Sequence, residues 1–107
     1  ALIDARKGLE MFLKVSVPVL GLVENMSYFL CPHCQMRSEI FEHGGVHKEA
    51  QILGVPLLAE VPLHIAIREA SEKGTPIVLS NPASPEGNIY QNLGQRVWAS
   101  LKKSSKA

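Results

Sequence analysis

The residues with the clearest chemical potential in this sequence are Cys31 and Cys34, its only two cysteines, which are separated by a Pro-His dipeptide. Thiolates at this spacing can bind one side of a metal ion or of an iron–sulfur cluster, but a complete site needs further ligands. Those ligands must come from elsewhere in the chain or from a second chain. Otherwise the pair performs thiol–disulfide chemistry without a metal.

Histidines offer one way to complete the site within a single chain. Cys31, Cys34, His43 and His47 follow the spacing C-x2-C-x8-H-x3-H, which resembles a zinc site with a shortened central spacer. A helix that starts at the Gly-Gly pair after His43 would place His47 on its first turn. On this hypothesis the chain is a zinc-stabilised binding module.

Redox chemistry is a further alternative, because Cys-Pro-His-Cys is also the active-site sequence of a strongly oxidising thioredoxin-fold protein. That chemistry needs the first cysteine at a helix N-terminus directly after a strand, where its pKa is lowered. Residues 28–30 are only a weak strand, and the segment after Cys34 soon reaches the Gly-Gly pair. The sequence favours this dithiol oxidoreductase less than either metal site.

The composition and net charge of the chain indicate its class and limit the kinds of partner it can bind. The chain has 107 residues, of which 46% are hydrophobic and 20% charged, and its formal net charge is +1. These values indicate one small globular domain and give no electrostatic sign of a nucleic acid or membrane partner. No apolar run reaches the length of a membrane span. Two closely spaced cysteines in such a chain indicate a ligand or redox pair in a reducing compartment.

The hydrophobic pattern predicts elements that position these residues. Helices are expected at about residues 1–15, 46–53, 65–73 and 85–103, and buried strands at 17–23 and 55–61, with Pro62 ending the second. A brief extended piece is expected at 76–79, and residues 24–47 are expected to form a metal-binding loop insertion. The tail at 102–107 is predicted to be basic and flexible. Strands alternating with helices predict an α/β fold with a parallel sheet.

The thin sheet and the opening inside a helix suggest that the chain is the C-terminal half of a doubly wound domain. We therefore expect residues 1–107 to form a single α/β segment of a three-layer α/β/α protein. Met26, Tyr28, Phe29 and Leu30 gather in the predicted loop, and we expect this apolar cluster to form a dimer contact. Packing back onto the domain is the alternative.

Five short motifs in order carry a family resemblance: ALIDARKG at 1–8, VENMS at 23–27, CPHC at 31–34, IF with HGG at 40–45, and PLH with IREA at 62–70. On these motifs the chain resembles the Mrp/ApbC family of P-loop ATPases, the iron–sulfur cluster carriers, including its mitochondrial nucleotide-binding-protein-like branch. The resemblance extends to about residue 97. It implies a doubly wound P-loop NTPase fold and a homodimer.

The resemblance also implies roles for particular residues. Cys31 and Cys34 match the pair that binds a [4Fe-4S] cluster, and a homodimer joined through the CPHC loop would supply both halves of the ligand set. Asn25 matches the residue that reads the adenine of ATP. Pro62 and His64 match the segment that lines the base and ribose. Ligands of such folds lie beyond the carboxyl ends of parallel strands.

The chain departs from the family in one respect. It contains no phosphate-binding loop of the form G-x-x-x-x-G-K-[ST], so the Lys and magnesium cradle that phosphoryl transfer requires is absent from it. We expect ATP hydrolysis to belong to the longer parent and this chain alone to be inactive. The resemblance implies delivery of the cluster to apo iron–sulfur proteins in a bacterial cytoplasm or a mitochondrial matrix.

Overall fold

The fold is known from a computed structural model that describes residues 2–39 and 45–105. Its elements are α1 (Leu2–Lys14), β1 (Leu22–Leu30), β2 (Arg37–Ser38), α2 (Gly45–Leu53), β3 (Leu57–Leu63), α3 (Ile65–Glu72), α4 (Ile77–Ser80) and α5 (Pro85–Ser105). The predicted α/β class is confirmed, and the four predicted helices lie within a few residues of their expected places.

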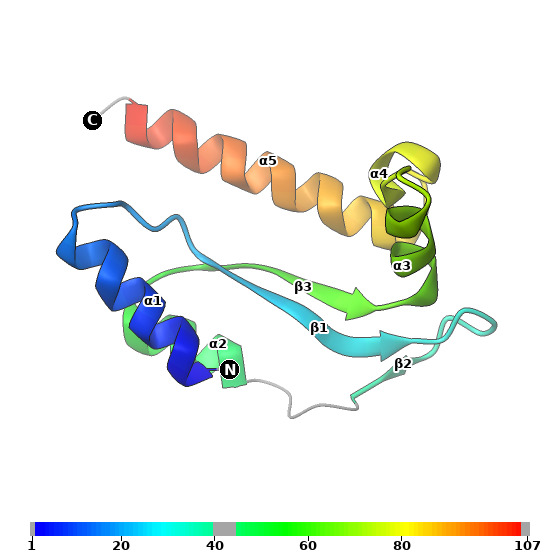
Figure 1. Cartoon of the computed structure of the whole chain (residues 1–107), viewed down its shortest axis with the longest axis horizontal. Coiled ribbons are helices and arrows are strands. Elements are labelled where there is room, and N and C mark those ends of the chain that lie inside the picture. Colours follow the sequence, from blue (N-terminus) through cyan, green and yellow to red (C-terminus); the bar gives the residue numbers. More distant parts are fainter. Residues whose placement is uncertain (1, 40–44, 106–107) are drawn as a thin grey trace.

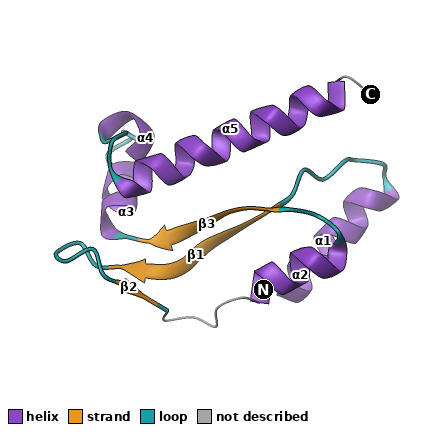
Figure 2. Cartoon of the chain, turned by 180° about the vertical axis from the view of Figure 1, so that it is seen from behind, coloured by secondary structure: helices purple, strands orange, loops and turns teal. Residues whose placement is uncertain are grey.

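The sheet of the described chain has the strand order β2-β1-β3 (Figure 1). Strands β1 and β3 run parallel and are connected through α2, whereas β2 is antiparallel to β1. The sheet is therefore mixed, and not purely parallel as predicted. In Figure 2, α5 runs along the β3 side, and α1 and α2 lie together near the start of the two parallel strands.

Strand β1 starts later and ends later than predicted. The Leu22 amide donates to the Pro56 carbonyl at 2.8 Å, which brings β1 alongside the chain that enters β3. Gly21 allows this approach, because a Cβ there would lie 2.6 Å from the Pro56 oxygen. The rest of β1 contains polar residues, so the sequence does not indicate a strand there. In the structure Ser27 is buried, and its hydroxyl donates to Glu24 Oε1 at 2.5 Å. Residues 24–30 are thus strand, and the prediction of a loop from residue 24 is wrong.

Pro62 lies inside β3 instead of ending it. Proline has no amide hydrogen and is tolerated in a strand only where the ladder does not need one. Here the pairing with β1 is irregular between Asn25, opposite Val61, and Phe29, opposite Leu63, and Met26 in that gap has a φ of 55°. Pro62 therefore faces a bulge in the neighbouring strand.

The short segments between helices also differ from prediction in one place. Glycines with positive φ follow α2 and α3, at Gly54 and Gly74, where a left-handed residue commonly ends a helix. An extended piece was predicted at residues 76–79, but residues 77–80 form the single turn α4, in which Ile77 is buried. In the described part of the chain no strand pairs with these residues, and their backbone is satisfied within the turn, where the Ser80 and Asn81 amides donate to the Pro76 and Ile77 carbonyls at 3.0 and 2.9 Å.

The C-terminal helix α5 begins with a capped turn and ends further along than expected. Ser84 Oγ accepts a hydrogen bond from the Gly87 amide at 3.0 Å, which is a side-chain N-cap ahead of Pro85. The helix continues to Ser105, so residues 102–105 of the predicted flexible tail are helical, and 106–107 lie outside the described residues. Leu101 near its end is exposed, since α5 diverges from the strands toward its C-terminal end (Figure 1).

The core lies between the sheet and the helices that cover it. Its buried apolar residues come from α1, both parallel strands and the helices α2 to α4: Leu9, Tyr28, Leu30, Ala50, Leu58, Val61, Ala70 and Ile77. On α3, Ala70 is buried and Ile65 is exposed. No helix in the described residues is long and apolar enough to cross a lipid bilayer.

Candidate metal site in the cysteine hairpin

The two cysteines lie in the loop that joins β1 to β2. Cys31 directly follows β1, and the loop closes where the Cys31 amide donates to the Met36 carbonyl at 3.0 Å. The Gln35 amide in turn donates to the Cys31 carbonyl at 3.0 Å, with Gln35 at a φ of 62°. A residue in this left-handed region lets a short hairpin loop turn back on itself. The loop is thus a defined turn that holds both thiols in one place.

The environment of Cys31 favours its thiolate. Hydrogen bonds from the backbone of Cys34, then from the backbone of His33 and the Cys34 thiol, lower the pKa of Cys31 below its ordinary value. Both thiols are free, and Cys34 is exposed while Cys31 is half-buried. Because metals bind the thiolate and not the thiol, a lowered pKa favours coordination by Cys31. This geometry fits a thiolate-bound metal or cluster.

The hairpin does not match the dithiol oxidoreductase hypothesis. That chemistry places the first cysteine at the start of a helix, but residues 32–34 form a turn and the next element is β2. Cys31 does follow a strand directly, which the sequence only weakly indicated. The groups that lower the pKa of Cys31, the backbone of Cys34 and His33 and the Cys34 thiol, therefore belong to the turn and not to a helix N-terminus.

The zinc hypothesis involves two histidines, and the structure describes one of them. His47 lies on α2 and is exposed, whereas His43 falls outside the described residues. Within residues 2–39 and 45–105, no group of three or more His, Cys, Asp or Glu side chains is placed to hold a metal ion. Cys31 and Cys34 thus form an incomplete ligand set in this part of the chain.

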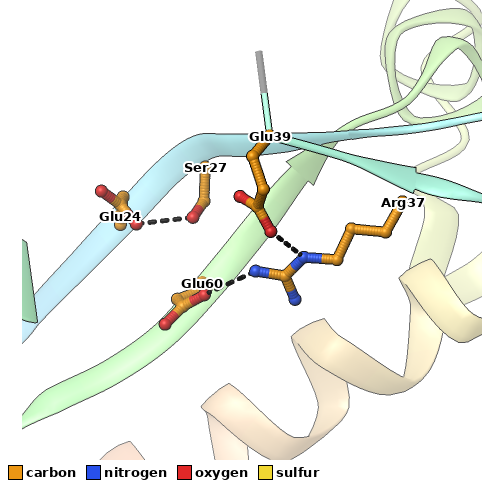
Figure 3. A network of polar contacts seen from close by, with 5 residues as sticks. All are labelled: Glu24, Ser27, Arg37, Glu39 and Glu60. Carbon is orange, nitrogen blue, oxygen red and sulfur yellow. Dashed lines mark hydrogen bonds and ion pairs between the residues drawn. The ribbon is translucent and has the colours of Figure 1, made fainter. Parts of the chain in front are cut away.

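A polar network attaches the hairpin to the parallel strands (Figure 3). Arg37 Nε lies 2.6 Å from Glu39 Oε1, and Arg37 Nη2 lies 3.4 Å from Glu60 Oε2 on β3. The same guanidinium stacks over the ring of Tyr28, 3.8 Å from its centroid. The link from Arg37 to Glu60 joins residues 23 positions apart, so no local pattern in the sequence indicates it.

The apolar residues before the cysteines pack mainly into the domain. Tyr28 and Leu30 are buried, Phe29 is half-buried, and only Met26 is largely exposed. Burial, the largest effect, raises the pKa of Tyr28 above its ordinary value, although Arg37 opposes the shift. The expectation that this cluster forms a dimer contact is wrong for Tyr28 and Leu30, since they belong to strand β1 and its core.

The residues predicted to bind nucleotide lie on β1 and at the end of β3. Asn25 is exposed within β1, and its Oδ1 accepts a hydrogen bond from the Met26 amide at 3.0 Å. Pro62 and His64 are both buried. His64 Nδ1 accepts from the Ala66 amide at 3.0 Å and so caps α3. Of the three, Asn25 has the side chain that solvent reaches most readily.

Sequence reasoning missed a buried acidic partner of His64. Glu86, in the first turn of α5, has its Oε1 3.8 Å from His64 Nε2, and both side chains are almost fully buried. His64 Nε2 makes no hydrogen bond within the described residues. An acidic residue directly after Ser84 and Pro85 is a known preference of helix starts, but that preference alone does not reveal its partner.

Two parallel strands end at a common edge, beside a hairpin with two thiols and the start of a helix, and this is the edge at which open α/β folds bind their ligands. Among solved structures, the chain is similar to the cell division ATPase MinD of Pyrococcus furiosus, with a TM-score of 0.69 and 25% identity. This likeness covers 92% of the present chain and 38% of that one. It confirms the predicted P-loop NTPase fold class.

The family model described as "ParA: NUBPL iron-transfer P-loop NTPase" matches residues 1–98, and the chain belongs to this family. It is 52% identical over 104 residues to the mouse iron-sulfur cluster transfer protein NUBPL. It is also 52% identical over 101 residues to the iron-sulfur cluster carrier protein of Escherichia coli K12. A third relative, at 50% identity, is the Arabidopsis thaliana iron-sulfur protein required for NADH dehydrogenase, mitochondrial.

The matches cover nearly all of this chain but a small part of each relative. They include 97% of the chain and 33% of the mouse protein, and 94% of the chain and 27% of the bacterial one. The chain therefore spans between about a quarter and a third of the length of these curated relatives. The family resemblance stated from the motifs is confirmed.

Proposed function

We propose that this chain is the part of an iron–sulfur cluster carrier that holds the cluster. Cys31 and Cys34 bind one side of a [4Fe-4S] cluster, and the same pair from a second copy binds the other side through the CPHC loop. The observation that carries this proposal is the hairpin itself, in which two free thiols lie on one turn that is closed by hydrogen bonds of the Cys31 backbone to Met36 and Gln35. The names of the relatives support the iron–sulfur cargo.

A symmetric pair of chains is the simplest way to complete the ligand set. A [4Fe-4S] cluster is usually held by about four thiolates, and one chain supplies two. A two-fold axis beside the hairpin brings an identical pair into reach. A cluster held by so few ligands from each chain can also be released to an apo iron–sulfur protein more readily than one enclosed by a single chain.

Nucleotide belongs to the proposal only for the longer parent protein. There ATP with magnesium would bind a phosphate loop that this chain does not contain, and Asn25 with the segment from Pro62 to His64 would contact the base and ribose. Because Pro62 and His64 are buried, their contribution would come through the backbone at the end of β3. A bacterial cytoplasm or a mitochondrial matrix would suit such a carrier.

The test is anaerobic reconstitution of the chain with ferrous iron and sulfide, followed by analysis of iron, sulfide and molecular mass. We expect equal amounts of iron and sulfide on a dimer, and loss of both in Cys31→Ser and Cys34→Ser. His47→Ala is the matched control and should load normally. Unchanged iron in both cysteine variants would exclude the site, and a loaded monomer would exclude the shared cluster.

The same samples test zinc as the alternative occupant. A zinc-stabilised module would bind one zinc per chain and lose it in His43→Ala and in His47→Ala. The carrier would be indifferent to both changes. Zinc that depends on the cysteines but not on the histidines would be an adventitious occupant of the cluster ligands.

A further inference from the structure

The short strand β2 cannot by itself hold the cysteine hairpin in place. It has two residues, and its pairing with β1 consists of Phe29 with Ser38 and Leu30 with Arg37. A two-stranded hairpin of this length is at best marginally stable in water. Side-chain contacts must therefore fix the hairpin relative to the rest of the domain.

The pairing between β1 and β3 is also weak at this end. It is irregular after Asn25, opposite Val61, and resumes only at Phe29, opposite Leu63. The cysteine end of β1 is thus separated from the regular part of the ladder by a bulge. A contact that spans this bulge would fix the hairpin more effectively than one on either side of it.

Arg37 makes that contact. Its backbone lies beyond the bulge, opposite Leu30 and next to the Met36 carbonyl that closes the cysteine loop. Its guanidinium reaches back to Glu60, which pairs with Glu24 in the regular part of the ladder. The Arg37 guanidinium also stacks on the ring of Tyr28, which is buried and therefore held in a fixed position.

We propose that Arg37 is a positioning residue for the metal bound by Cys31 and Cys34. It does not touch the metal; it holds the base of the loop so that both thiolates keep one orientation relative to β3. This inference rests on the proposed function, because it assumes that the two cysteines bind metal. Glu60 is the far end of the same link, and Tyr28 is its support.

The test is an anaerobic titration of the full chain with cobalt(II), whose thiolate charge-transfer and visible bands report both binding and coordination geometry. We expect Arg37→Ala to weaken cobalt binding about tenfold and to change the visible bands. Arg37→Lys keeps the charge without the planar stacking and should recover part of the affinity. Glu60→Gln should shift affinity in the same direction by less, and it keeps the proposal testable if Arg37→Ala does not fold.

Arg6→Ala is the matched control, because Arg6 also joins two elements through a glutamate, with its Nε 2.6 Å from Glu49 Oε1. It should lower thermal stability without changing the cobalt spectrum or affinity. If Arg37→Ala and Glu60→Gln both bind cobalt as wild type does, while Cys31→Ser does not, the positioning role is wrong. If Cys31→Ser also binds as wild type does, the proposed function fails instead.

Discussion

His64 and Glu86 meet in the interior of the protein where α3 and α5 begin, with 3.8 Å between Nε2 and Oε1. The His64 imidazole has two tasks there. Its Nδ1 accepts the Ala66 amide, and a nitrogen that accepts a hydrogen bond carries no proton, so neutral His64 has its proton on Nε2, the nitrogen nearest Glu86. One buried ring thus caps one helix and neighbours the first turn of another.

Substitutions at His64 separate these two tasks. His64→Ala removes the cap and leaves the Glu86 carboxylate without its neighbour, and we expect the free energy of unfolding to fall by about 2 kcal/mol. His64→Asn retains a good capping side chain and should cost clearly less. His64→Asp also caps, but it places a second carboxylate near Glu86 and should fall between them. Urea unfolding measures all three, and equal losses for Ala and Asn would contradict a capping role.

The Arg6–Glu49 pair between α1 and α2 predicts a pH dependence of stability. Arg6 Nε and Nη2 lie 2.6 and 2.8 Å from the two carboxylate oxygens, and the hydrogen bond from Arg6 lowers the pKa of Glu49 below its ordinary value. A carboxylate with a lowered pKa stabilises the fold above its unfolded pKa, and the effect is lost as pH falls through its folded pKa.

We therefore expect Glu49→Gln to be less stable than wild type at neutral pH, with the difference shrinking once the pH falls below about 4.5. Urea unfolding across a pH series measures this. Glu72→Gln is the control, because its partner Arg68 is 3.7 Å away and both side chains are exposed. That variant should match wild type throughout. A constant deficit for Glu49→Gln at every pH would mean that the carboxylate charge is not what stabilises the pair.

The turn amides at the cysteine loop predict the reactivity of Cys31. Because hydrogen bonds from Cys34 and His33 lower its pKa, Cys31 should reach half of its maximal alkylation rate at a lower pH in the folded protein than in urea. Iodoacetamide labelling followed by peptide mass spectrometry measures this rate for each cysteine separately. Identical pH profiles in the folded and unfolded chain would show that the amides do not stabilise the thiolate.

Two glycines predict opposite effects of the same substitution. Gly21→Ala places a Cβ 2.6 Å from the Pro56 oxygen, and we expect a loss of about 2 kcal/mol in the free energy of unfolding. Gly8→Ala, inside α1 with nothing within 4 Å of its Cβ, should gain about 0.5–1 kcal/mol. Thermal or urea unfolding of the two variants checks the pair. A neutral Gly21→Ala would mean that the chain before β1 moves freely away from Pro56.

The helices were predictable from the sequence because their signals are local. Gly54, Gly74 and Pro85 mark helix ends through their own backbone preferences, and each lies where that preference predicts. The strands were less predictable. Glu24 and Ser27 are polar residues typical of loops, yet they lie inside β1, where the Ser27 hydroxyl donates a hydrogen bond to the Glu24 carboxylate.

The candidate site was predictable in part. Cys31 and Cys34 could be singled out from their spacing alone, and the hairpin that presents them required the structure. The supporting contacts of Arg37 with Glu60, and of His64 with Glu86, join residues more than twenty positions apart. Such pairs depend on the tertiary fold, and no local pattern in one sequence indicates them.

The bulge opposite Pro62 has a consequence for the motions of the sheet. Only one register pair, Phe29 with Leu63, joins β1 to β3 beyond it. Fraying should therefore start at the cysteine end of these strands, and backbone amides there should exchange with deuterium sooner than those around Val23 and Ala59. A cargo bound at the hairpin would slow that exchange, which makes the isotope content of this strand end a direct report of loading.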